Sequence, residues 1–425
     1  MQTVSSHQTA PSLSVMQRLR ALGPGIMMAA AAVGGSHLVA STKAGAIYGW
    51  QLAALILLVN LFKYPFFRAG VQYTAGTGET LVEGYARLGR PYLWLFVALS
   101  AVSGVINTAA LTLFSASLLS YFVPFDLSLT VLSTIIVITC LVILIAGHYK
   151  ALDLLAKVIM ATLTCATLVA VTVAVGNPVA VEPSFNAPSI WSVAAIGFIV
   201  VTMGWMPAPI EISSITSVWL KRKAQSEPIN AKAALFDFNV GYIGTAALAI
   251  VFLSLGALLM HGSGVELKQS GIGFSHQLVG LYAATIGEWS RYLIAVVAFF
   301  CIFGSTITVI DGYARVVSES QRLLRGQTEA EANPAIAQGW MVLISVLALA
   351  IVAFWTGALL TMLDFAMVAA FVTTPFFALL NYILVTKHRL PPEVTMSKAM
   401  RALAITGLVY LFGFLAVFVW WKWLM

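Results

Sequence analysis

Long apolar segments follow one another along almost the whole chain, and short polar connections separate them. Eleven are long enough to cross a bilayer as helices, since about 20 apolar residues span its hydrocarbon core. They cover residues 22–48, 50–73, 92–122, 128–147, 152–176, 190–219, 234–260, 290–320, 339–358, 361–385 and 402–424. The pattern predicts an all-α integral membrane protein, with a polar N-terminal tail over 1–21 and one transmembrane domain over 22–425. The longest connections, about 261–289 and 321–338, are too short and polar for separate domains.

Two of the predicted helices, the first and the sixth, are interrupted. The interruptions are Gly34-Gly35-Ser36-His37 and Met206-Pro207-Ala208-Pro209. Irregular backbone at membrane depth is tolerated only where it is buried in protein or lines a cavity. Two broken helices at corresponding positions of two halves are typical of secondary transporters, which bind their substrate between the breaks. We therefore predict that both breaks are non-helical and face each other near the middle of the bilayer.

The composition agrees with a membrane protein. Hydrophobic residues make up 60% of the chain, charged residues 9%, and the mean hydropathy is +0.93. The N-terminal tail lacks the short apolar core and cleavage site of a signal peptide, so we expect the first helix itself to insert. Cys140, Cys165 and Cys301 lie in apolar runs without a CxxC spacing, which favours core packing over disulfides or metal binding.

Basic residues predict the orientation. With a cytoplasmic N-terminus, most Lys and Arg residues of the connections lie in the cytoplasm, and few lie outside, chiefly Lys268, Arg291 and Lys422. This asymmetry follows the positive-inside rule and places the C-terminus outside. It also accounts for the net charge of +7, so we expect no nucleic acid partner. The loop pattern favours a bacterial inner membrane.

Four segments resemble the natural resistance-associated macrophage protein (Nramp) family. GPGIMMAAAAVGGSHLVASTKAGAIYGWQL is similar to the family's first helix, in which GPG, about eight apolar residues and DPGN follow one another. VTMGWMPAPIEISS lines up with the family's A-x-x-M-P-H-N segment, and TGETLVEGYARLG and ITVIDGYAR resemble two further segments. The resemblance implies a LeuT-type fold, with inverted five-helix repeats over 22–176 and 190–385 and a peripheral helix over 402–424. It also implies secondary transport of a small inorganic ion by alternating access.

The chain departs from the family at the positions that bind metal. By resemblance, Gly34 stands at the family's metal-binding Asp, His37 at its Asn, and Ala208 at a His associated with proton movement. Such a site would favour a soft or borderline divalent ion. The candidate metal ligands are His37, Met206, the backbone carbonyls near Gly34 and Met203, and Glu211.

Two other interpretations of the first break remain open. The N–H groups of Gly35, Ser36 and His37, at the positive end of a half-helix, suit bicarbonate, a carboxylate or an amino-acid-like solute. Alternatively, the small residues simply allow two helices to cross closely. The family favours a metal ion, whereas the lost carboxylate at Gly34 and the Gly-rich first break favour an anion or an amino-acid-like solute. Pro207 and Ala208 of the second break are further candidate substrate-binding residues.

Several charged residues fall within the predicted spans, where each should face protein or water. They are Glu211, Asp237, Asp311, Asp364, Lys43, Lys63 and Arg68. If protons drive transport, Glu211 or His37 should carry the transferable charge. The i,i+4 spacing predicts a local pair for Asp311 with Arg315, and a clamp or gate for Asp153 with Lys157.

An enzyme is the main alternative to a transporter. Ser36 and His37 are adjacent, and neighbours on a helix point in different directions, so we expect no hydrogen bond between them. HExxH, GxSxG and phosphate-loop motifs are absent from the sequence. A channel is disfavoured because the sequence has no repeated filter segment. We predict neither catalysis nor a cofactor.

Overall fold

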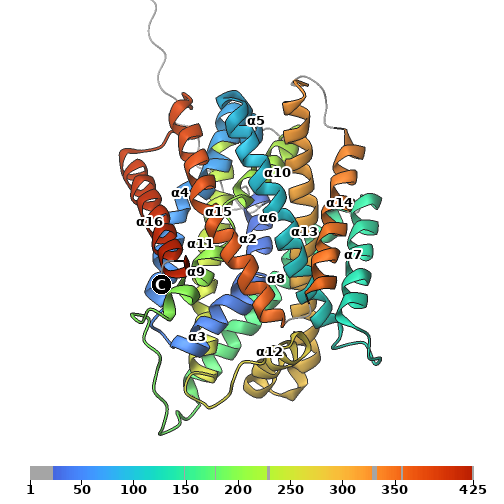
Figure 1. Cartoon of the computed structure of the whole chain (residues 1–425), viewed down its shortest axis with the longest axis vertical. Helices are drawn as coiled ribbons and strands as arrows, with labels where there is room; N and C mark the ends of the chain where they lie inside the picture. Colours follow the sequence, from blue (N-terminus) through green and yellow to red (C-terminus); the bar gives the residue numbers. More distant parts are fainter. Residues whose placement is uncertain are drawn as a thin grey trace, which may run out of the picture.

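The computed structural model describes residues 23–147, 149–177, 179–226, 230–327, 333–355 and 358–423. Throughout this part of the chain the regular elements are helices, which pack side by side in one bundle (Figure 1). The first half contains α2 (Pro24–Ala32), η1 (Ser36–Ser41), α3 (Thr42–Tyr48), α4 (Ala53–Thr77), α5 (Leu81–Leu88), α6 (Arg90–Leu119), α7 (Leu129–Ala146) and α8 (Tyr149–Gly176). The second half contains α9 (Ala195–Trp205), α10 (Ile212–Ser226), α11 (Ala231–Leu259), α12 (Gly271–Ile286), η2 (Glu288–Ser290), α13 (Arg291–Leu324), α14 (Pro334–Phe354), α15 (Leu359–Lys387) and α16 (Lys398–Trp423).

The predicted membrane character is confirmed. Among the described residues, nine helices are long and apolar enough to cross a membrane, and the bent pair of Pro24–Ala32 and Ser36–Tyr48 provides a tenth span. The apolar helix α9 has only 11 residues, and α10 follows it after a break. Eleven spans therefore remain a prediction, as does the tail over 1–21, which lies outside the described residues.

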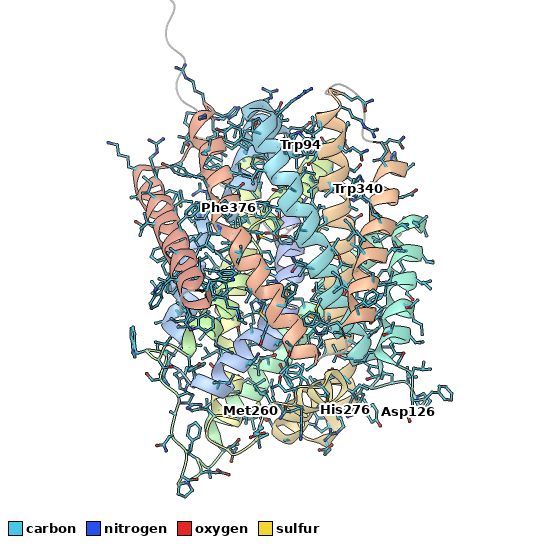
Figure 2. All side chains as sticks on the ribbon, in the orientation of Figure 1. Trp94, Asp126, Met260, His276, Trp340 and Phe376 are labelled. Carbon is cyan, nitrogen blue, oxygen red and sulfur yellow. The ribbon has the colours of Figure 1, made fainter. Side chains whose placement is uncertain are left out.

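The outer surface of the bundle is apolar, as lipid contact requires. Large side chains such as Trp94 on α6 and Val142 on α7 are exposed. Asp126 and His276 lie at one end of the bundle, and Trp94 and Trp340 lie toward the other (Figure 2). Cys140 and Cys301 are buried, but Cys165 is exposed, so core packing was the wrong prediction for Cys165. It lies on a face of α8 that the bundle leaves uncovered.

Two short helices, α5 and α12, lie at opposite ends of the bundle (Figure 1). Each follows the second long helix of its half, α4 or α11, and opposite placement is what inverted repeats require. Thr80 and Glu83 start α5 with a capping box, and Ser270 caps α12. The region 261–289, predicted to be a connection between spans, contains α12, a helix that was not predicted. At 16 residues, α12 is shorter than a membrane span, so counting span lengths misses it.

The first helix packs tightly on α11. The Asp237 carboxylate of α11 accepts hydrogen bonds from the N–H groups of Gly23 and Gly25, at 3.0 and 2.7 Å. These N–H groups lie at the start of α2, where the helix dipole stabilises a negative charge. Further along, a Cβ added to Gly45 would lie 2.0 Å from the Leu253 oxygen of α11. The Gly-Pro-Gly start and Gly45 therefore permit close backbone approach.

A similar close approach joins α9 to α15, and it depends on Gly204. A Cβ at this position would lie 1.9 Å from the Met367 carbonyl oxygen. We expect Gly204→Ala to destabilise the fold by about 1–3 kcal/mol, the usual effect of overpacking. Thermal unfolding in detergent measures it, with Gly244→Ala as control because no atom of the described residues lies within 4 Å of a Cβ there. Equal midpoints for the two variants would contradict this account of the crossing.

Candidate functional site

The sixth-helix break is non-helical, as predicted. Helix α9 ends at Trp205 and α10 begins at Ile212, and Met206 has an extended backbone. In a continuous helix, the carbonyls of Met203 and Trp205 would bond to the N–H groups four residues later. Those positions are Pro207 and Pro209, which have no N–H. The two prolines therefore leave carbonyl groups that other partners must satisfy.

The first-helix break is a bend, and here the prediction was only partly correct. A turn at residues 33–34 leads into the π-helix η1, and the axis bends by 44°. Both glycines make close contacts: an added Cβ would lie 2.5 Å from Ser305 Oγ at Gly34, and 2.5 Å from the Trp205 ring at Gly35. The helix can bend without unwinding because the backbone continues as a wider helix. These contacts agree with the interpretation of close helix crossing.

The π-helix also brings Ser36 and His37 together, contrary to prediction. Ser36 Oγ lies 2.6 Å from His37 Nδ1, because the backbone here is not that of an α-helix. His37 Nε2 lies 2.8 Å from the Thr245 carbonyl of α11. A carbonyl only accepts, so Nε2 carries the hydrogen of the bond to Thr245. Nδ1 also lies 3.2 Å from the Ala32 carbonyl, to which the Ser36 hydroxyl donates. Both ring nitrogens are thus engaged, and His37 faces α11.

Each of the predicted metal ligands His37, Met206 and Met203 has a hydrogen-bond partner within the protein. Met206 Sδ is buried and accepts from Ser41 Oγ at 3.7 Å. The Met203 carbonyl accepts from Lys63 Nζ of α4 at 2.7 Å. His37 is engaged with Thr245. In the described part of the chain, no group of three or more His, Cys, Asp or Glu residues could hold a metal ion.

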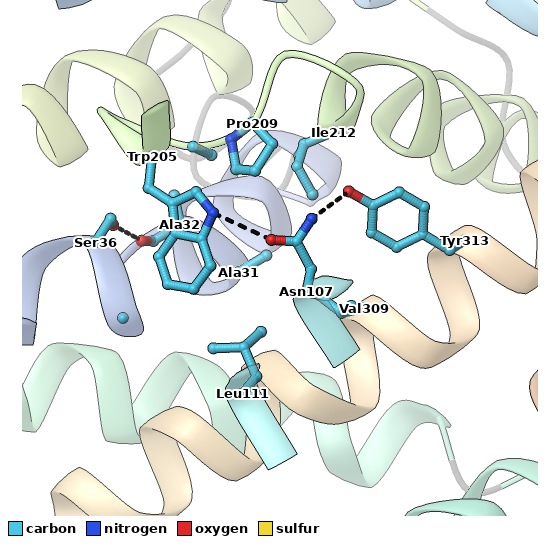
Figure 3. Close-up of a pocket in the computed structure, with 12 residues that line it drawn as sticks. Ala31, Ala32, Ser36, Asn107, Leu111, Trp205, Pro209, Ile212, Val309 and Tyr313 are labelled. Carbon is cyan, nitrogen blue, oxygen red and sulfur yellow. Dashed lines mark hydrogen bonds between the residues drawn. The ribbon is translucent and has the colours of Figure 1, made fainter. Parts of the chain in front are cut away.

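A small cavity separates the two breaks. Its volume is about 30 Å³, enough for one or two waters or a dehydrated ion. Helices α6 and α13 close its remaining sides (Figure 3). The lining includes Gly35 and Ser36 from the first break, Ala208 and Pro209 from the second, Asn107 from α6 and Tyr313 from α13. The two breaks therefore face each other, as predicted.

A chain of hydrogen bonds crosses the cavity wall to Glu211. Trp205 Nε1 donates to Asn107 Oδ1 at 3.1 Å, and Asn107 Nδ2 donates to the Tyr313 hydroxyl at 3.1 Å (Figure 3). That hydroxyl donates to Glu211 Oε1 at 2.9 Å. Each group in the chain thus fixes the orientation of the next.

Glu211 retains one unused oxygen. Its Oε2 and the Ser103 hydroxyl are buried and lack hydrogen-bond partners among the described residues. Ser103 lies beside Glu211, although its geometry falls short of a hydrogen bond. Unpartnered buried carboxylate oxygens are costly, and they mark places where a proton, water or cation binds.

Sequence reasoning found Glu211 but missed Asn107, Tyr313 and Ser103. The available signal was polar spacing inside an apolar helix, since Ser100, Ser103 and Asn107 repeat at three- and four-residue intervals on α6. Tyr313 lies within the ITVIDGYAR segment, which had been noted only for its resemblance.

Ion pairs tie helices together at both ends of the bundle. Lys43 of α3 binds Asp364 of α15 at 2.7 Å. At the end marked by α5, Glu83 binds Lys221 of α10 at 2.7 Å and lies 3.8 Å from Arg322 of α13.

Two other predicted pairs can be compared with the structure. The pair of Asp311 and Arg315 is confirmed at 2.6 Å. The side chains of Asp153 and Lys157 lie outside the described residues, so their clamp remains a prediction.

The Glu83 cluster predicts an acid-sensitive contact. Burial alone would raise the pKa of Glu83, but hydrogen bonds from Lys221 and Thr80 outweigh it and hold the pKa below its ordinary value of 4.5. A lowered pKa contributes stability above the unfolded-state value, and that stability is lost as the pH falls through the folded-state value. We expect the thermal unfolding midpoint of the wild type to decrease as the pH is lowered below about 4.5. The midpoint of Glu83→Gln should decrease less over the same pH range. Identical pH profiles would contradict this role of Glu83.

Comparison with known proteins places these features in context. The model of a family described as natural resistance-associated macrophage protein-like matches residues 25–421. An uncharacterized protein of Pasteurella multocida (strain Pm70) is 48% identical over 407 residues, which cover 95% of this chain and 92% of the relative.

Solved structures with the same fold are more distant in sequence. A mutant of the Eremococcus coleocola manganese transporter is 14% identical with a TM-score of 0.68, over 97% of this chain and 89% of that chain. Mhp1, a nucleobase-cation-symport-1 family transporter in a closed conformation, is 14% identical with a TM-score of 0.59, over 94% and 92%. The predicted LeuT-type fold is thereby confirmed.

Proposed function

Because the chain belongs to the natural resistance-associated macrophage protein-like family, a family of transporters, we propose that it is a secondary active transporter of a small inorganic ion. The observation that carries this proposal is the cavity of about 30 Å³ between the two broken helices, whose lining residue Tyr313 donates a hydrogen bond to the buried Glu211 carboxylate. Pockets for organic ligands usually have hundreds of Å³, so this space suits an ion.

The first candidate substrate is a divalent metal cation. The family and the fold shared with a manganese transporter support it. Glu211, Ser103, Asn107 and Tyr313 offer oxygen atoms, which hard cations prefer. We therefore propose a metal site at Glu211, in place of the sulfur and imidazole ligands expected at Met206 and His37. Glu211 also remains the proposed carrier of a coupling proton, since both nitrogens of His37 are engaged.

Alternating access is supported by the two sets of ion pairs. Lys43 attaches α3, the second half of the first broken helix, to α15. Lys221 attaches α10, the second half of the sixth, to α5. We propose that each set opens in turn while the other stays closed, so that the cavity opens to one side at a time.

A second candidate substrate is a small anion such as bicarbonate, or an amino-acid-like solute. It is favoured by the fully buried Lys63, whose charge interacts with that of Glu211. With this pair already balanced, a divalent cation would bring uncompensated charge into a buried site.

Binding measurements on the purified protein separate these candidates. Manganese, cadmium, bicarbonate and amino acids are titrated separately, and we expect saturable metal binding that weakens about tenfold or more in Glu211→Gln. Weakening by His37→Ala and Met206→Ala, with Glu211→Gln unchanged, would favour the soft-ligand site instead. Binding of bicarbonate or amino acids without metal binding would overturn the metal proposal in favour of the second candidate.

A further inference from the structure

Lys63 is a fully buried cation at the sixth-helix break, and it is not one of the ligands proposed for the metal site at Glu211. Its side chain is 0% exposed in the middle of α4. The ammonium group lies 2.7 Å from the Met203 oxygen, 3.0 Å from the Gly204 oxygen and 3.5 Å from the Ala208 oxygen. All three carbonyls belong to the C-terminal end of α9 or to the break that follows. An ammonium group has three donors and here meets three backbone acceptors.

The sequence explains why these carbonyls are available. The helical partner of the Met203 oxygen would be the N–H of residue 207, which is a proline. The helix ends at Trp205, so the carbonyl of Gly204 lies in its last turn and that of Ala208 lies beyond it. Carbonyls at these positions have no N–H partner within the helix. The C-terminal end of a helix carries partial negative charge, which favours a cation. Together the three oxygens form an acceptor cluster, which we call the carbonyl cage.

Carbonyl cages at the ends of broken helices bind free monovalent cations in transporters of many folds. Backbone carbonyls can replace the hydration shell of such an ion, as they do in potassium-selective filters. In this protein the cage is filled by a side chain from another helix. The charge of Lys63 also interacts with that of the buried Glu211.

We propose that the carbonyl cage is a monovalent-cation site that Lys63 occupies with its own ammonium group, as a tethered cation. The site accepts ammonium, potassium or sodium once the lysine side chain is removed. This consequence rests on the proposed transport function: because the lysine already fills the cage, uptake should not require sodium. The cage itself is independent of which substrate is carried.

The test is chemical rescue of the full-length protein in detergent. Lys63→Ala opens the cage, whereas Lys63→Met fills it with an uncharged side chain of similar length. Lys43→Ala is the matched control, because it removes a membrane lysine that binds a carboxylate instead of carbonyls. Thermal unfolding is followed with increasing ammonium, methylammonium, potassium or sodium chloride, at an ionic strength held constant with choline chloride.

We expect the unfolding midpoint of Lys63→Ala to rise saturably with at least one of the small cations, as binding to the folded state requires. The wild type, Lys63→Met and Lys43→Ala should show no such rise. Equal responses in all four proteins would overturn the proposal. A Lys63→Ala protein that failed to fold in every salt would also overturn it, because the proposal requires ammonium to bind in the emptied carbonyl cage and restore the fold.

A second measurement uses the wild-type protein alone. Replacing sodium by choline should leave the initial rate of manganese uptake unchanged. A saturable requirement of this uptake for sodium would overturn the tethered-cation role. The thermal experiment requires no transport, so failure of the proposed function and failure of this inference give different results.

Discussion

Glu211→Gln is expected to reduce ion uptake by about tenfold or more, since an interaction with a charged group contributes about 1.5–3 kcal/mol. Glutamine keeps the size of the side chain and can still accept from Tyr313, so the fold should persist. It removes the negative charge that interacts with Lys63, and it replaces the carboxylate oxygen proposed to bind the ion. Initial uptake rates in proteoliposomes measure the effect.

Glu288→Gln provides the matched control. Glu288 is an exposed carboxylate of η2 and is paired with Arg291, the first residue of α13. It should transport like the wild type. If Glu211→Gln retained a comparable rate and the same pH dependence, Glu211 would be neither the ligand nor the proton carrier.

Gly35→Val should also abolish uptake, whatever the substrate. The first carbon of a side chain at this position would lie 2.5 Å from the Trp205 ring, and valine adds two methyl groups beyond it. The side chain would therefore fill the cavity or displace Trp205 from Asn107. Uptake in proteoliposomes is measured together with the unfolding midpoint, which separates a blocked site from a misfolded protein.

Gly304→Val on α13 controls for the cost of a β-branched residue in a helix, since within the described part of the chain nothing lies closer than 4 Å to a Cβ at Gly304. It should fold and transport. Uptake by Gly35→Val near that of Gly304→Val would show that the cavity is not on the transport route.

The bundle was predictable from the sequence because its signals are local. An apolar run of membrane length identifies a span by itself, and Pro207 with Pro209 identifies a break by the donors that they remove. The pair of Asp311 and Arg315 followed from spacing alone. Helix α12 was missed because it is apolar but too short to satisfy the length criterion.

The site was less predictable because it depends on distant contacts and on one local irregularity. A π-helical segment turns the side chains that follow it relative to an α-helix, so the facing of His37 could not be read from helical spacing. Lys63 and Met203 are 140 positions apart in the chain. Nothing near either residue indicates the other, and Asn107 is a single amide within an apolar helix.

The glycine contacts of the first helix constrain how the molecule can move. Gly25 and Gly45 bring α2 and α3 against α11, and His37 binds the Thr245 carbonyl of that same helix. Both halves of the first helix are thus fastened to one neighbour, on either side of the bend. Packed backbone of this kind slides poorly, so these segments should travel as one rigid body. We therefore expect the relative motion to occur between this rigid body and helices α6 and α13, which line the opposite side of the cavity.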